Sequence, residues 1–341
     1  MKVFCGTHAE DFTNRVCKHL DLTKGKIDVS SFKDNEVSVM INENVRNQNC
    51  IVIQNCCNLN GKSVNDSFME ILVIVDALKR GSANKVIVVM PYYCYSRSDR
   101  KDYSRAPISA SVIANCLMAL NVDRIITYDL HAGQIAGFFS NICPLDNLYN
   151  ELYFIKYIRE VISLDHIGLP LVIVSPDEGG MKTATRIAGK LNCAVASIYK
   201  QREKANEVST MKLMGNVKGH IAIIVDDMID TGGTACKAAD TLAENGSLQI
   251  YMLASHGILS EPAIQRINDS NFTGVIITNT ITPKTEVINS KKIKIIDVSW
   301  LCAEAIKRQE NGKSLKELYN NENILNENSI ELNELNELNE F

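Results

Sequence analysis

The stretch Ile221-Ala-Ile-Ile-Val-Asp226-Asp227-Met-Ile-Asp230-Thr231-Gly232-Gly233-Thr234 decides the fold of this 341-residue chain. Its apolar run, Ile221 to Val225, is short and β-branched, which predicts a buried strand of a parallel sheet. A glycine-threonine turn that opens a helix can surround a phosphate with N–H groups and hydroxyls, and the acidic pair can accept hydrogen bonds from vicinal hydroxyls. The pattern indicates a ribose phosphate site. The simpler interpretation is a solvated strand end followed by an ordinary connection.

Further short apolar runs, each followed by a helix-compatible stretch, repeat along the chain. They are Cys50 to Ile53, Val86 to Met90, Arg124 to Tyr128, Leu171 to Val174, Gln249 to Leu253, Val275 to Thr278 and Ile293 to Val298. This alternation predicts an α/β protein with mostly parallel sheets flanked by helices. The same order of elements runs once up to Asp129 and again up to Asp227, which indicates two similar domains.

Composition and charge argue against several classes of function. With 45% hydrophobic residues the chain can build two cores, and a net charge of -4 gives no basic field for nucleic acid. The 11 cysteines form no C-x-x-C pair, so we expect neither a disulfide framework nor a zinc site, and a cytoplasmic protein. No apolar stretch reaches the roughly 18 residues of a membrane span, so we expect no export and no membrane insertion.

Two further segments set the expected domain boundaries. Ser140 to Glu151 carries a proline, aspartate and asparagines, which is typical of a linker. From about Asn320 the chain becomes a near-triplet pattern of Asn, Glu and Leu, whose leucines drift around a helix instead of forming one stripe. We therefore expect an N-terminal domain over residues 1–145, a C-terminal domain over 146–319 and a disordered tail over 320–341.

Five further motifs occur in a fixed order. They are Phe32-Lys-Asp34-Asn35-Glu36, Arg97-Ser98-Asp-Arg-Lys101, Asp129-Leu-His131-Ala-Gly-Gln-Ile-Ala-Gly-Phe-Phe139, Ser175-Pro-Asp177-Glu-Gly-Gly180 and Lys200-Gln-Arg202-Glu-Lys-Ala-Asn-Glu-Val208. The turn up to Thr234 resembles the phosphoribosyl-binding loop of phosphoribosyltransferases and ribose-phosphate pyrophosphokinases. The five motifs, within a match over residues 2 to 319, resemble the pyrophosphokinases. This resemblance implies two phosphoribosyltransferase-like domains, the first on the ATP side and the second on the ribose 5-phosphate side.

The resemblance implies an enzyme that makes phosphoribosyl pyrophosphate and AMP from ATP and ribose 5-phosphate, by in-line attack of the anomeric hydroxyl on the β-phosphorus. It implies that Lys200 and Arg202 are catalytic, and that Mg²⁺ is held by Asp129, His131 and Asp177. The residues implied for ATP are Phe32, Asp34, Asn35, Glu36, Arg97, Ser98, Asp102 and His131. Those implied for ribose 5-phosphate are Asp226, Asp227, Asp230, Thr231, Gly232, Gly233 and Thr234.

The resemblance also extends to assembly and regulation. It implies a homo-oligomer, a hexamer, in which Asp34 and Glu36 reach the nucleotide of a neighbouring subunit. The phosphate-regulated class of the family implies an effector site, with inorganic phosphate as activator, at Arg46, Ser82, Arg105 and Ser314. The chain departs from the family pattern in three segments, with Ser98 in place of a glutamine, Ser140 in place of an aspartate and Asn44 in place of a serine.

Two other functions stay open. A phosphoribosyltransferase would use the same turn but needs only one such domain, so the duplicated first half argues against it. A catalytically silent regulatory subunit of the same family would not need Lys200, Arg202, His131 and Asp226, which are all present. Without the resemblance, Asp34 to Glu36 would be a plain turn, and the polar stretch from Lys200 to Gly215 an exposed loop.

Overall fold

The computed structural model describes residues 1–201 and 210–320, and the chain divides into two compact units. Unit 1 contains Met1–Tyr149, Thr280–Thr282 and Val298–Leu318, whereas unit 2 is built mainly from Asn150–Asn279 and Pro283–Asp297. Unit 1 is therefore completed by two segments from far along the chain. This division differs from a continuous second domain over residues 146–319, because the chain returns to unit 1 near its end.

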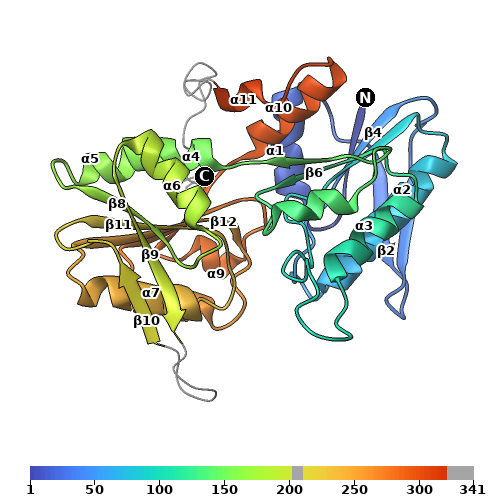
Figure 1. Ribbon diagram of the computed structural model, residues 1–341. Helices are drawn as coiled ribbons and strands as arrows, with labels where there is room; N and C mark the ends of the chain where they lie inside the picture. The colour runs from blue at the N-terminus through green and yellow to red at the C-terminus, as the bar shows by residue number, and fades with distance from the viewer. Residues whose placement is uncertain (202–209, 321–341) are drawn as a thin grey trace. The chain divides into compact units, whose positions relative to one another are not determined.

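The return of the chain to unit 1 follows from the packing of α10 (Ser299–Glu310), drawn in red in Figure 1. This helix packs against α1 (Glu10–Leu20), and its Leu301 is fully buried. The hydroxyl of Tyr128 donates a hydrogen bond of 2.9 Å to the carbonyl of Val298, just before the helix. Because burial of its apolar face stabilises the helix there, α10 belongs to unit 1.

Unit 1 is organised around a five-stranded sheet in which all neighbouring strands are parallel. In spatial order the strands are β1 (Lys2–Cys5), β4 (Asn49–Ile53), β5 (Lys85–Val89), β6 (Arg124–Tyr128) and β7 (Leu145–Leu148). The antiparallel ribbon of β2 (Ile27–Ser31) and β3 (Val37–Ile41) is separate. The remaining helices are α2 (Val64–Arg80), α3 (Ser109–Ala119) and the 3₁₀ helix η1 (Gly133–Phe138). Helix α11 (Glu317–Asn320) follows α10, and unit 1 ends within it, at Leu318.

Unit 2 is organised around a seven-stranded sheet. In spatial order its strands are β10 (Thr210–Met214), β9 (Ala194–Gln201), β8 (Leu171–Ser175), β11 (Ile221–Ile229), β12 (Gln249–Gly257), β13 (Gly274–Thr278) and β14 (Ile293–Ile296). Only β10 runs antiparallel to its neighbour. The helical segments are α4 (Glu151–Tyr157), η2 (Ile158–Ile162), α5 (Ser163–Asp165), α6 (Met181–Leu191), α7 (Gly233–Glu244), α8 (Ala263–Asp269) and α9 (Thr285–Ile288).

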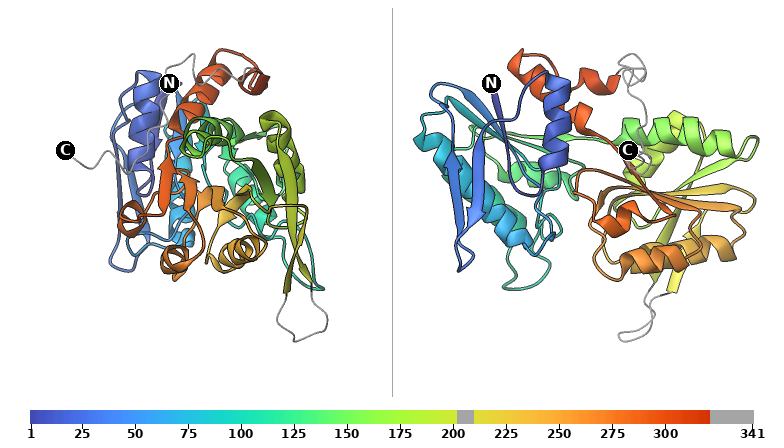
Figure 2. Two further views of the ribbon diagram at one scale, coloured as in Figure 1. Left: turned by 90° about the vertical axis from the view of Figure 1, so that its left-hand side faces the viewer. Right: turned by 180° about the vertical axis from the view of Figure 1, so that it is seen from behind.

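Helices cover both faces of the sheet of unit 2, with α6 on one face and α7 on the other in Figures 1 and 2. Apolar side chains of β11 are buried throughout Ile221 to Val225, as a doubly covered strand requires. The expected α/β fold with two similar sheets is therefore confirmed. Among the helices in residues 1–201 and 210–320, none combines the length and apolarity needed to cross a bilayer.

Two elements of unit 2 differ from the sequence-based expectation. The strand β11 runs on to Ile229 instead of ending at Val225, because β12 pairs with it along this whole length. The polar stretch after Lys200, expected as a loop, contains β10, which pairs with β9 from Thr210 opposite Gln201 to Met214 opposite Ser197. Strand β10 reads Thr-Met-Lys-Leu-Met, with Met211 and Leu213 half-buried, and an alternation this short does not stand out within the polar sequence around it.

Candidate active site

The acidic pair Asp226 and Asp227 lies near the carboxyl end of β11, a central strand of unit 2. Asp226 stands opposite Ala254 of β12, and the N–H of Asp227 donates to a carboxylate oxygen of Asp226 at 2.9 Å. Both side chains are half-buried. The carboxyl edge of a parallel sheet is where α/β proteins bind ligands, so the pair is positioned for one.

The electrostatics of this edge disfavour an isolated negative charge. Burial raises the pKa of Asp226 well above its usual range, and repulsion from Asp227 and Asp177 raises it further. The three carboxylates of unit 2 therefore interact with one another. A hydrogen-bond donor or a cation at this edge would relieve the unfavourable charge.

The glycine-threonine turn follows β11 and leads directly into α7. Gly232 adopts the left-handed conformation, with φ 72° and ψ -8°, and its carbonyl accepts the N–H of Cys236 at 2.9 Å. A Cβ on Gly232 would meet Ala263 only at ordinary contact distance, 3.6 Å. The backbone conformation, and not a lack of space, is thus what favours glycine here. Thr231 and Thr234 are exposed at the start of the helix, where N–H groups have no helical partner.

Asp177 lies just after β8, at the same edge of the sheet in unit 2. Its carboxylate accepts the N–H of Gly180 at 2.9 Å, and its carbonyl accepts the hydroxyl of Ser175 at 2.7 Å. A Cβ on Gly180 would come within 2.7 Å of that same hydroxyl oxygen. The tight turn therefore holds an exposed carboxylate in place before α6.

In unit 1, Asp129 and His131 follow β6. The backbone at Asp129 has φ 30°, and its N–H donates to the carbonyl of Leu148 at 2.8 Å. The N–H of Leu130 donates to the side-chain oxygen of Asn147 at 3.1 Å. This strained turn is held by β7 and presents the exposed His131 before η1.

The loop between β5 and α3 carries Arg97, Ser98 and Asp102. Ser98 caps α3, because its hydroxyl accepts the N–H of Ser109 at 3.3 Å and its carbonyl that of Ala110 at 3.1 Å. The serine that departs from the family pattern thus has a structural partner. Arg97 is exposed, and Asp102 forms an exposed ion pair of 2.8 Å with Arg100.

A side-chain hydrogen bond joins this loop to the segment that follows His131. The amide of Gln134, on η1, donates to the carboxylate of Asp99, which is buried. Within unit 1 the structure therefore brings the Arg97 and His131 segments together.

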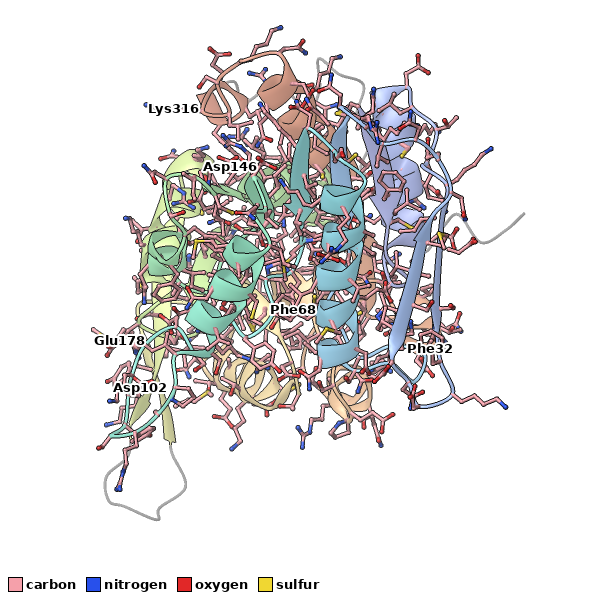
Figure 3. All side chains as sticks on the ribbon, turned by 90° about the vertical axis from the view of Figure 1, so that its right-hand side faces the viewer. Phe32, Phe68, Asp102, Asp146, Glu178 and Lys316 are labelled. Atoms are coloured by element: carbon pink, nitrogen blue, oxygen red, sulfur yellow. The ribbon has the colours of Figure 1, made fainter. Side chains whose placement is uncertain are left out.

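The Phe32–Glu36 segment is the exposed turn between β2 and β3. The N–H of Phe32 donates to the carbonyl of Glu36 at 2.8 Å, and that of Glu36 to the carboxylate of Asp34 at 3.2 Å. Asn35 has φ 70°, a conformation that asparagine tolerates. Phe32 is 60% exposed and lies well apart from Asp102 in Figure 3. The structure does not bring this turn to the Asp102 loop within one chain.

The candidate effector residues lie in unit 1. The N–H of Arg46 donates to the side chain of Asn44 at 3.0 Å, and that of Asn47 to the carbonyl of Ser82 at 2.8 Å. Asn49 donates to Glu310 at the end of α10, after which Ser314 follows. The Arg46 and Ser82 turns are therefore neighbours, whereas the carbonyl of Ser314 accepts a hydrogen bond of 2.9 Å from Arg308. Arg105 lies in the loop before α3, with φ 65°.

The expected catalytic pair is only partly within the described residues. Lys200 belongs to β9, opposite Met211 of β10, whereas Arg202 lies outside the described residues. In the described part of the chain, no group of three His, Cys, Asp or Glu side chains gathers where it could hold a metal ion. Mg²⁺ commonly takes one or two carboxylates together with substrate phosphates and waters, so the donors present fit a cation that arrives with ATP.

Sequence reasoning missed the residues that support the motifs. Asn147 holds the turn after β6, and Asp99 with Gln134 joins two motif segments. Arg266 donates to the carbonyl of Thr231 in the glycine-threonine turn. Their partners are distant in the sequence, so no local pattern marks them.

Comparisons with known proteins cover most of the chain. Residues 1–120 match the family described as the N-terminal domain of ribose phosphate pyrophosphokinase, and residues 200–320 match the phosphoribosyl synthetase-associated domain. Phosphoribosylpyrophosphate synthetase from Mycobacterium smegmatis is similar in structure, with a TM-score of 0.84 and 33% identity over 91% of this chain and 99% of that chain.

Phosphoribosyltransferases are more distant. A purine phosphoribosyltransferase from Pyrococcus horikoshii has 15% identity and a TM-score of 0.28, covering 48% of this chain and 85% of that chain. An APRTase from Giardia lamblia has 13% identity and a TM-score of 0.29, covering 36% and 77%. The synthetase match extends over nearly both whole chains, and it shows that this chain belongs to the ribose-phosphate pyrophosphokinase family.

Proposed function

We propose that this chain transfers the pyrophosphoryl group of ATP to ribose 5-phosphate, giving AMP and phosphoribosyl pyrophosphate. The observation that carries the proposal is the edge of unit 2, where Asp226 and Asp227 precede the left-handed turn at Gly232. Acceptors for two neighbouring hydroxyls and donors for a phosphate thus lie on one continuous segment. That combination matches the chemistry of a ribose phosphate, and membership of the family supports the same reaction.

The proposed sugar site uses the charge pattern of this edge. Asp226 and Asp227 accept hydrogen bonds from the ribose hydroxyls. These hydrogen bonds stabilise the charged carboxylate of Asp226, whose pKa is raised by burial and by repulsion from its neighbours. The 5-phosphate is bound by the segment from Asp230 to Thr234, at the positive end of α7. The sugar is thereby oriented by its hydroxyls and anchored by its phosphate.

The proposed transfer is a direct displacement. The anomeric hydroxyl attacks the β-phosphorus of ATP in line, the bond between that phosphorus and the α,β-bridging oxygen breaks, and AMP leaves. Lys200 and Arg202, assigned by the family resemblance, neutralise charge that develops on the transferred group. Lys200 belongs to β9, which pairs with β10 at the edge of the sheet of unit 2.

We propose Asp129, His131 and Asp177 as the residues that contact the metal, as the family resemblance implies. The carboxylates are oxygen ligands of the kind that Mg²⁺ prefers, and the mutual repulsion around Asp226 favours a nearby cation. When bound, Mg²⁺ supplies neutralisation of the phosphate charges. His131 is exposed and can donate a hydrogen bond to a phosphate oxygen.

The nucleotide site is proposed to be shared between subunits of a homo-oligomer, with Arg97, Ser98 and Asp102 from one chain. The separation of Phe32 from Asp102 within unit 1 supports completion by the Phe32–Glu36 turn of a neighbour. The neighbouring turns that carry Arg46 and Ser82 support an anion effector site, to which the resemblance adds Arg105 and Ser314, and inorganic phosphate is the proposed activator.

A coupled assay of the purified chain tests the proposal. We expect AMP release that requires ATP, Mg²⁺ and ribose 5-phosphate and no nucleobase. A requirement for a nucleobase would instead identify a phosphoribosyltransferase. The absence of turnover by the chain alone, with turnover restored by an active family member, would identify a regulatory subunit.

The acidic pair provides a second test with a matched control. Replacing both Asp226 and Asp227 by asparagine should raise the KM for ribose 5-phosphate by about tenfold to a hundredfold, since hydrogen bonds to charged groups are lost. The KM for ATP should change much less. Asp269→Asn, an exposed change on α8, should leave both constants as they are. Equal weakening of both substrates would point to a metal role for the pair.

A further inference from the structure

The guanidinium of Arg266 lies against the phosphate-binding turn, although no step of the proposed reaction uses it. Arg266 is on α8, and its Nη1 donates a hydrogen bond of 2.9 Å to the carbonyl of Thr231. The same nitrogen would lie 3.5 Å from a Cβ placed on Gly233. The positive charge therefore sits beside the backbone that joins these residues.

The helix that carries Arg266 is held against the turn by backbone contacts. The N–H groups of Ile258 and Leu259 both donate to the carbonyl of Ile229, at 3.0 and 3.2 Å. Ala263, the first residue of α8, is fully buried and lies 3.6 Å from the position of a Cβ on Gly232. Arg266 thus reaches the turn from a fixed base, and its hydrogen bond is not the only connection between them.

The geometry of the peptide bond gives this hydrogen bond a directional effect. In a trans peptide the carbonyl and the N–H point to opposite sides. When Arg266 holds the carbonyl of Thr231, the N–H of Gly232 in the same peptide points away from that guanidinium. The left-handed conformation of Gly232 leads the following N–H groups into the first turn of α7, which is how anion-binding concavities form. A charged donor on the carbonyl also polarises the peptide, so its N–H becomes a stronger donor.

The charge of Arg266 also reaches the start of α7. Burial raises the pKa of the Cys236 thiol in the first turn of this helix, and the guanidinium of Arg266 opposes that rise. The charge therefore adds to the positive end of the helix dipole, where an anion would be bound.

We propose that Arg266 is a positioning residue for the 5-phosphate of ribose 5-phosphate. It holds the peptide between Thr231 and Gly232 so that the N–H faces the phosphate, and it supplies positive charge behind the turn. The inference rests on the proposed function, because the ligand of the turn is taken to be that phosphate. It concerns binding of the sugar phosphate and not the transfer step.

Arg266→Gln and Arg266→Lys test this inference, with Arg159→Gln as the matched control. Arg159 is also exposed in unit 2, and its Nη2 donates to the carbonyl of Lys190 at the same distance, 2.9 Å. Arg266→Gln should raise the calorimetric Kd and the KM for ribose 5-phosphate by about tenfold, the effect of one charge-assisted hydrogen bond. Arg266→Lys should recover part of this loss. The KM for ATP, kcat and the melting temperature should stay close to those of the unchanged chain, and Arg159→Gln should alter none of these quantities.

The outcomes separate this inference from the proposed function. Unchanged affinity for ribose 5-phosphate in Arg266→Gln, in a chain that releases AMP normally, overturns the inference alone. A parallel loss of kcat, both substrate affinities and melting temperature also overturns it, because a residue that merely supports α8 behaves so. A chain that binds ribose 5-phosphate, loses affinity in Arg266→Gln and releases no AMP keeps the inference and overturns the reaction. A chain that binds no ribose 5-phosphate overturns both.

Discussion

The strands β6 and β11 both lead into acidic residues, but the helices that follow them differ. After β6 in unit 1 come Asp129 and His131 and then a 3₁₀ helix of 6 residues. In unit 2 the acidic pair lies near the carboxyl end of β11, and the turn at Gly232 and an α-helix of 12 residues follow the strand. A regular α-helix aligns its peptide dipoles toward a phosphate, whereas a short 3₁₀ helix does so poorly. The backbone N–H groups at the start of α7 are therefore suited to an anion in unit 2, whereas in unit 1 an anion would have to be bound by side chains.

The largest expected effect concerns the hairpin that extends the sheet of unit 2. Lys200→Ala and Arg202→Ala should each lower kcat by roughly a hundredfold to a thousandfold, because one preorganised charge is lost from a phosphoryl-transfer site. The KM values should move much less, since an interaction made in the transition state lowers kcat and kcat/KM together. Lys212→Ala, an exposed change on β10 of the same hairpin, is the control and should retain turnover. A steep rise in the KM for ATP with normal kcat would make the pair a nucleotide clamp.

A pair of glycine substitutions tests the difference between the two segments directly. Gly232→Ala places a side chain on a left-handed residue, at a cost of about 1–2 kcal/mol, so the turn should shift and the KM for ribose 5-phosphate should rise by about tenfold. Gly133→Ala, at the start of η1, meets no atom within 4 Å. Its steady-state constants should match those of the unchanged chain. An equal rise in this KM for both variants would contradict the idea that only the segment of unit 2 binds the phosphate through its backbone.

The two units should also respond to pH in opposite directions. Burial lowers the pKa of His8, which follows β1, so below about pH 6.5 the unfolded chain binds a proton that the folded chain does not. Unit 1 therefore loses stability as the pH falls. The raised pKa of Asp226 means that the folded chain keeps a proton which the unfolded chain has lost above about pH 3.8, so unit 2 loses stability as the pH rises.

Thermal unfolding without ligands checks both signs. Asp226→Asn removes a buried charge and its repulsion from Asp227 and Asp177, so it should raise the melting temperature. The rise should be about 2–4 °C for each kcal/mol of stability gained, and it should be larger at pH 8 than at pH 5. His8→Asn should flatten the loss of stability between pH 7 and pH 5, because the buried imidazole whose pKa is lowered is then absent. A gain from Asp226→Asn that is largest at low pH would contradict the assigned direction.

The smallest expected effect is that of removing residues 321–341. This segment lacks a continuous apolar stripe in its sequence, so its loss should leave kcat and the melting temperature nearly unchanged. A large drop in either quantity on truncation would show that the segment supports one of the units.

The central strands of both sheets could be predicted because their signal is local. A buried strand such as β6 is a short β-branched run, and its bounds agree with those expected from the sequence. The strand β7 reads Leu-Asp-Asn-Leu, which has too few apolar residues to be told from a linker. The strand β1 has four residues, too few for a recognisable alternation. The assignment of α10 to unit 1 depends on the surface that it covers, and the sequence of a helix does not show which surface it packs against.

The same distinction applies to the candidate site. The acidic pair and the glycine turn are adjacent in the sequence, so their combination could be recognised before the fold was known. The contacts of Asn147 and Gln134 depend on elements that only the fold brings together. Arg266 is 35 residues from Thr231 along the chain. The candidate residues are therefore marked by local pattern, whereas the residues that contact them are known only from the tertiary structure.

The return of α10 to unit 1 has a consequence for synthesis of the chain. A ribosome releases residues 1–149 first, then nearly all of unit 2, and only afterwards the helix that packs on α1. Domains generally fold as units during translation, N-terminal first, but here the N-terminal unit lacks a packing layer until almost the whole chain has emerged. Unit 2 is encoded almost continuously and can complete its core earlier. The second unit in the sequence is thus the first that can finish folding, and the apolar surface left open on the nascent first unit is where chaperones would be needed.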